Sequence, residues 1–138
     1  CLKICMHICK MSTLQILKEF QTQVIAFFDE LIAQFPNEGD LVVMRLFIST
    51  QMPIEDTINK FIHELAKNDG EKRQAVKDRN ESFFLSFEAA SATAEKYKFN
   101  HFKKLWRSGQ LDNEDKRVIW QWMDTFIFLA DKYVKSKG

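Results

Sequence analysis

The sequence is poor in the residues that interrupt helices, with only four glycines and two prolines in 138 residues. Leucine, isoleucine, phenylalanine, lysine and glutamate are plentiful, and this combination favours long helices over a many-turned β fold. No apolar run reaches the roughly 20 residues that a membrane-spanning helix needs, so we expect a soluble chain with no membrane partner. The formal net charge is only +1, so any contact with nucleic acid would require a local basic patch.

Cysteine is absent after position 9, and all three cysteines lie in the lead segment 1–10. Their spacing of four matches neither zinc-ribbon nor common iron–sulfur patterns. We therefore expect free thiols, no metal and no cofactor, in a reducing, intracellular compartment. Met11 followed by Ser12 and Thr13 is a more natural beginning, because Ser12 or Thr13 can cap the helix that follows. Residues 1–10 are accordingly predicted to precede the natural start, and residues 11–138 to form one helical domain.

Apolar residues recur at spacings of three and four along most of the chain. This pattern predicts an all-α, single-domain bundle of about five or six helices around a phenylalanine-rich core. The expected helical segments are 13–35, 41–50, 53–67, 71–94, 96–107 and 113–135.

Residues 41–50, LVVMRLFIST, are apolar nearly all round except for Arg45. A strand is the alternative there, since Val, Ile and Phe favour strands. A lone strand needs a partner, however, and no second strand signal appears. We therefore predict a short buried helix.

Residues 105–133 hold all three tryptophans and an acidic helix start. Asp112, Glu114 and Asp115 suit the N-terminus of a helix, so we interpret them as capping residues rather than metal ligands. Helical spacing places Trp106 and Trp122 in the core.

Two aromatic residues of the last helix are the candidate partner-binding residues. Phe128 falls at the centre of the polar side of that helix, and Trp120 falls at the edge of its apolar arc. Aromatic anchors dominate interface energetics, so we predict that both bind a protein partner, either another subunit or a virion protein. The alternatives for Phe128 are that another segment covers it or that it is simply exposed.

A basic strip is predicted upstream of the last helix, on a different face from the apolar residues of 96–107. It consists of Lys96, Lys103, Lys104 and Arg107. The strip is either a solvated face, a contact for an acidic protein or a contact for the phosphate backbone of nucleic acid.

No HExxH motif, glycine-rich phosphate loop or nucleophile elbow occurs in the sequence. We therefore predict a non-enzymatic protein with no catalytic residues.

Three segments together resemble small helical proteins encoded by large nucleocytoplasmic DNA viruses of algae and protists. They are FFDELIAQFPNEGDLVVMRLFIS (27–49), DRNESFF (78–84) and FKKLWRSGQLDNEDKRVIWQWMDTFIFLADKY (102–133). The resemblance implies a minor capsid or internal virion component, located in the virion or the host cytoplasm. It implies alternatively an accessory protein of viral DNA or RNA metabolism. No functional residue carries over from it.

Overall fold

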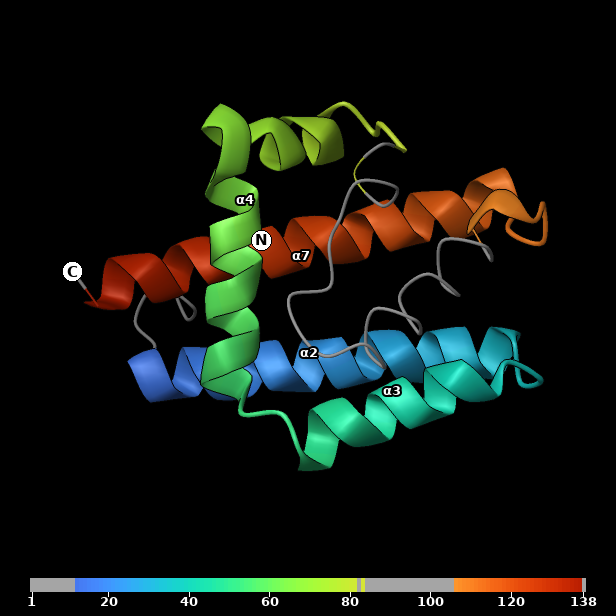
Figure 1. Cartoon of the computed structure of the whole chain (residues 1–138), viewed down its shortest axis with the longest axis horizontal. Helices are drawn as coiled ribbons and strands as arrows, with labels where there is room; N and C mark the ends of the chain where they lie inside the picture. Colours follow the sequence, from blue (N-terminus) through green and yellow to red (C-terminus); the bar gives the residue numbers. More distant parts are fainter. Residues whose placement is uncertain (1–11, 82, 84–105, 138) are drawn as a thin grey trace, which may run out of the picture.

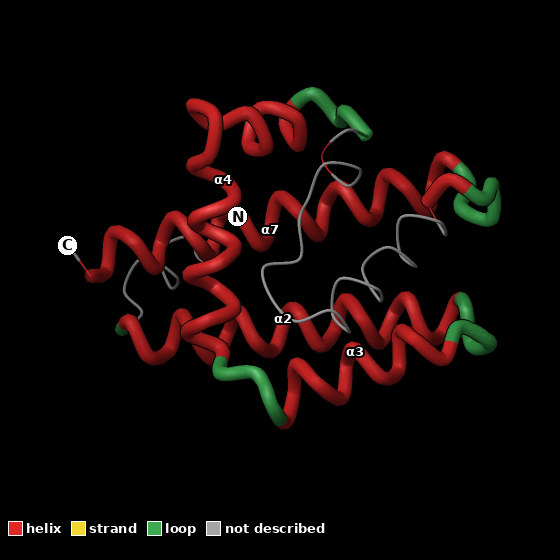
Figure 2. Tube along the Cα trace, in the orientation of Figure 1, coloured by secondary structure: helices red, strands yellow, loops and turns green. Residues whose placement is uncertain are grey.

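The computed structural model describes residues 12–81, 83 and 106–137, and within them it contains helices and loops but no strand (Figure 2). The helices are α2 (Thr13–Gln34), α3 (Gly39–Thr50), α4 (Ile54–Lys77) and α7 (Asn113–Lys137). The predicted all-α class is confirmed for this part of the chain. The predicted count of five or six helices is not matched, since the described residues contain four.

The long helices α2 and α7 lie side by side and run antiparallel, with α3 on the other side of α2 (Figure 1). At one end of the pair, the Thr13 hydroxyl donates to Ser136 Oγ at 2.8 Å. At the other end, the Trp122 indole N–H donates to Glu30 Oε2 at 2.7 Å. These two contacts fix the register of α2 against α7 over nearly their whole length.

Phenylalanine rings fill the space between α2, α4 and α7, as the sequence predicts. The Phe126 ring of α7 is central, with its centroid 5.9 Å from that of Phe20 and 5.7 Å from that of Phe27, both on α2. Phe61 of α4 lies 6.5 Å from Phe126 on a third side. Edge-to-face contacts of this kind add to the free energy of apolar burial, so this cluster holds the three helices together.

The starts of the two long helices carry the predicted caps. Ser12 Oγ accepts from the Gln15 N–H, and the Gln15 side chain accepts from the Ser12 N–H, which is a capping box. Asp112 and Asp115 make the same reciprocal pair at α7, at 2.8 and 3.1 Å. The backbone N–H of Asp112 lowers the pKa of the Asp115 carboxyl, with the Gln34 side chain as a second cause.

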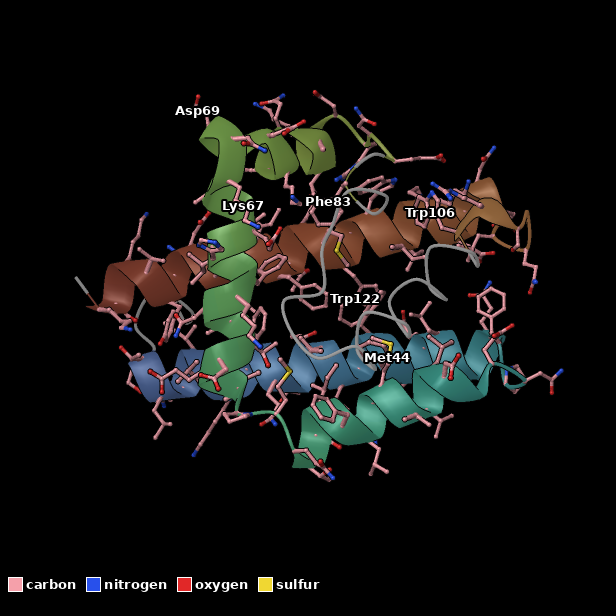
Figure 3. The ribbon with its side chains drawn as sticks, in the orientation of Figure 1. Met44, Lys67, Asp69, Phe83, Trp106 and Trp122 are labelled. Atoms are coloured by element: carbon pink, nitrogen blue, oxygen red, sulfur yellow. The ribbon has the colours of Figure 1, made fainter. Side chains whose placement is uncertain are left out.

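Helix α4 bends sharply at residues 67–70, where the sequence predicts that one helix ends and another begins (Figure 3). Asn68, Asp69 and Gly70 all have positive φ, at 52°, 57° and 81°. Asn, Asp and Gly are the residue types that adopt this left-handed conformation at least cost. The bend lets the first part of α4 cross α2 and α7 and turns the second part in a new direction (Figure 1).

Candidate interaction surface

Trp120 lies in the core, with 5% of its surface exposed. Its ring centroid is 6.2 Å from that of Phe83 and 5.7 Å from that of Trp106. The Arg79 guanidinium carbon lies 5.9 Å from the same ring. Helical spacing places Trp120 at the edge of the apolar arc of α7, and residues distant in sequence cover that edge. Little of the Trp120 side chain is therefore left exposed for a partner.

Phe128 is half-buried, and the Lys132 ammonium group lies 5.4 Å from its ring centroid. It sits on α7 between Asp124 and Asp131, four residues after one and three residues before the other. Both aspartates form ion pairs with arginines. Arg73, in the second part of α4, pairs with Asp131, and Arg79, just after α4, pairs with Asp124. Two half-exposed ion pairs therefore flank Phe128 on the polar side of α7.

The basic strip lies mostly outside the described residues, which exclude Lys96, Lys103 and Lys104. Its fourth member, Arg107, is exposed. The binding role of the strip stays a prediction.

A buried ionic cluster spans the bend of α4. Glu64 is 3% exposed and accepts a hydrogen bond from Lys67 Nζ at 2.7 Å, while Lys72 Nζ lies 3.1 Å from its other carboxylate oxygen. Burial by itself raises the pKa of Glu64, but the hydrogen bonds and charges of the two lysines outweigh it and hold the pKa below its ordinary value. The cluster joins the helical turns on either side of the bend, so its role is structural.

The surface that the sequence did not predict is the outer side of α3. Residues 41–50 are helical as predicted, but the prediction that this helix is buried is wrong. Leu41 is buried, whereas Val42, Val43 and Leu46 are 47%, 45% and 58% exposed. The reason is that α3 packs chiefly against α2. Apolar residues lie on both sides of α3, but only the side that faces α2 is covered. Met44, on the covered side, packs against the core (Figure 3).

Five residues share the outer side of α3 by helical spacing, and we call them the α3 outer strip: Gly39, Val42, Val43, Leu46 and Thr50. None of them carries a charge.

Three polar side chains in or beside the α3 outer strip have partners within the molecule. The Thr50 and Ser49 hydroxyls both donate to the carbonyl of Leu46, at 2.7 and 3.0 Å. The Arg45 guanidinium pairs with Asp29 on α2. The strip therefore presents methyl groups rather than hydrogen-bonding groups to its surroundings.

A signal for this surface exists in the sequence. A helix that is apolar all round is normally buried on all sides. Residues 41–50 are only ten residues long and stand between Pro36 and Pro53, so few neighbouring helices are available to cover them. With few neighbouring helices, a helix of this kind leaves part of its apolar surface uncovered, as the exposure of Val42, Val43 and Leu46 shows.

The described residues contain no group of three or more His, Cys, Asp or Glu side chains placed to hold a metal ion. Within the same residues, no helix has both the length and the apolar character that crossing a membrane requires. Comparison with protein-family models, with curated proteins and with solved structures found no match.

Proposed function

We propose that this chain is a non-enzymatic structural or interaction protein that binds another protein through the α3 outer strip. The observation that carries the proposal is the exposure of Val42, Val43 and Leu46 on one uncharged helix face. Burying such a face against a partner removes apolar surface from water, which is the main favourable term in protein association.

The setting proposed for this interaction is viral. The resemblance of residues 27–49, 78–84 and 102–133 to small helical proteins of large nucleocytoplasmic DNA viruses supports a minor capsid or internal virion component. The segment 27–49 includes most of α3 and four of the five residues of the strip, all except Thr50. The proposed location is the virion or the host cytoplasm.

The alternative is an accessory protein of viral DNA or RNA metabolism that contacts phosphates through the basic strip. Only Arg107 of that strip is among the described residues. Phosphate binding weakens steeply as salt is added, whereas an apolar interface does not, so salt dependence separates the two functions.

Site-specific photo-crosslinking tests the proposed function. A photoreactive phenylalanine replaces Val43 in the α3 outer strip, and in a control chain it replaces Leu14, which is 60% exposed on α2. In the particles or cells that contain the protein, we expect a crosslinked protein adduct from position 43 and much less from position 14. A nucleic-acid adduct in place of a protein adduct, or equal protein adducts from both positions, would overturn the proposal.

A further inference from the structure

We infer that the ion pair between Glu64 and Lys72 sets the direction in which the second part of α4, residues 71–77, leaves the bend. Glu64 lies in the last helical turn before the bend, and Lys72 lies just after it (Figure 1). Both residues are almost completely buried, at 3% and 8% exposed. The inference therefore gives this pair a conformational role that is separate from its contribution to stability.

The spacing of the two residues is the first argument. Side chains that contact each other along one helix are three or four residues apart, whereas Glu64 and Lys72 are eight apart. Eight residues of a continuous helix span about 12 Å along its axis. In the bent chain, Lys72 Nζ lies 3.1 Å from Glu64 Oε2, while Lys67 Nζ occupies the other carboxylate oxygen at 2.7 Å. The contact with Lys72 is therefore one that belongs to the bent form of α4.

The backbone of the bend is the second argument. Gly70 has a φ of +81°, and glycine adopts positive and negative φ about equally readily. A Cβ built at Gly70 would meet only the Leu65 carbonyl oxygen within 4 Å, at 4.0 Å, so close packing does not hold the backbone there. The residue types at the bend thus permit a change of direction, and the contacts that follow the bend select which direction is taken.

The other contacts of the second part of α4 are the third argument. Its buried apolar residues are Ala75 and Val76, which are small, and apolar burial is non-directional. Arg73 pairs with Asp131, but both side chains are 46% exposed, where an ion pair contributes little. Moving Lys72 away from Glu64, by contrast, would leave a buried charge without its counter-charge. The buried pair is therefore the contact that restricts the direction most strongly.

Distances between two spin labels, measured by electron paramagnetic resonance, test the inference. The labels are attached at Lys77→Cys, at the end of α4, and Lys18→Cys, on α2, in a chain whose three cysteines are replaced by serine. Both positions are exposed. We expect a narrow distance distribution, which Lys72→Met should broaden at least about twofold, because it removes the contact across the bend.

Lys67→Met is the matched control. It also removes one lysine partner of Glu64, but it leaves the pair across the bend intact, so the distribution should keep its width. Labels at Lys18→Cys and Gln121→Cys, on α2 and α7, report whether those two helices stay in place, and their distance should not change in either variant. Equal broadening by the two methionine substitutions, or no broadening by Lys72→Met, would overturn the inference.

The double variant Glu64→Leu/Lys72→Met separates direction from stability. It leaves no buried charge unpaired, so it should unfold in urea at a free energy close to that of the wild type. Its distribution between positions 18 and 77 should nevertheless be as broad as that of Lys72→Met. A stable double variant with the narrow distribution of the wild type would show that apolar packing alone sets the direction, and would overturn the inference.

Discussion

Arg79, just beyond α4, donates two hydrogen bonds to Asp124 of α7, at 2.9 and 2.7 Å, from a backbone position with a φ of +55°. The backbone N–H groups of Arg79 and Asn80 donate to the carbonyls of Val76 and Ala75, which closes the helix in a Schellman arrangement. Glycine is the usual residue at the left-handed position of this arrangement. Arginine is used here because its side chain reaches α7, where its guanidinium also lies against Trp120.

The cost of that backbone conformation is measurable with two substitutions of Arg79. Arg79→Gly and Arg79→Ala both remove the hydrogen bonds to Asp124, but only alanine retains the left-handed strain. We expect Arg79→Ala to be less stable than Arg79→Gly by about 1 kcal/mol in urea unfolding. Equal stability of the two variants would show that the strain is absent.

The ion pair itself is assessed separately with Asp124→Ala, which leaves the backbone of Arg79 unchanged. The paired side chains are half exposed, so the expected loss of unfolding free energy is about 0.2–1 kcal/mol, and it should shrink as salt is added. A loss well above this range would show that the pair is effectively buried.

Removing Glu64 should be far more costly than removing a surface carboxylate. Glu64→Leu leaves the buried Lys72 ammonium without its counter-charge, so we expect a loss of about 3 kcal/mol or more in urea unfolding. The double variant Glu64→Leu/Lys72→Met removes both charges and should recover most of that loss. A double variant no more stable than Glu64→Leu would contradict this account.

Protonation of Glu64 should also contribute to a loss of stability in acid. Its pKa in the folded chain is below its ordinary value of 4.5, so folding favours the ionised form. The stabilisation is present above about pH 4.5 and is lost as the pH falls through the folded pKa. Unfolding free energy measured between about pH 7 and pH 3 should therefore decline below about pH 4.5. The decline should be shallower in Glu64→Leu/Lys72→Met, and an unchanged acid slope in that variant would contradict the assignment.

Removing the N-terminal cap of α7 should lower the unfolding free energy by less than removing Glu64. Asp112→Ala removes the acceptor for the Asp115 N–H, so we expect a loss of about 1 kcal/mol in thermal or urea unfolding. Asp112→Ser retains an acceptor at the cap and should be close to the wild type. A serine variant as unstable as the alanine variant would show that the carboxylate charge, rather than the cap, matters.

Trp120 and Phe128 should differ in their effects on stability. Trp120→Ala empties a core site among Phe83, Trp106 and Arg79, so we expect a loss of about 3–5 kcal/mol. Phe128→Ser acts on a half-buried side chain and should cost less than half as much. A larger loss for Phe128→Ser would make Phe128 a core residue, whereas lost assembly with an unchanged melting temperature would make it a partner anchor.

Helices and their ends could be predicted from the sequence because their causes are local. The stripe through Phe20, Val24 and Phe28 follows from spacings of three and four. Ser12 and Asp112 cap helices through hydrogen bonds within three residues, and Asn68–Gly70 turns the chain through its own backbone preferences.

Whether each apolar face is buried or exposed depends on contacts between residues far apart in the chain. Trp120 is buried because Phe83 and Trp106 reach it, although its place on the helix indicates an edge. Val43 and Leu46 are exposed because, among the described helices, α3 packs chiefly against α2, although the composition of α3 indicates a core. Hydropathy shows which side chains favour burial, but only the packing of neighbouring helices decides which ones are covered.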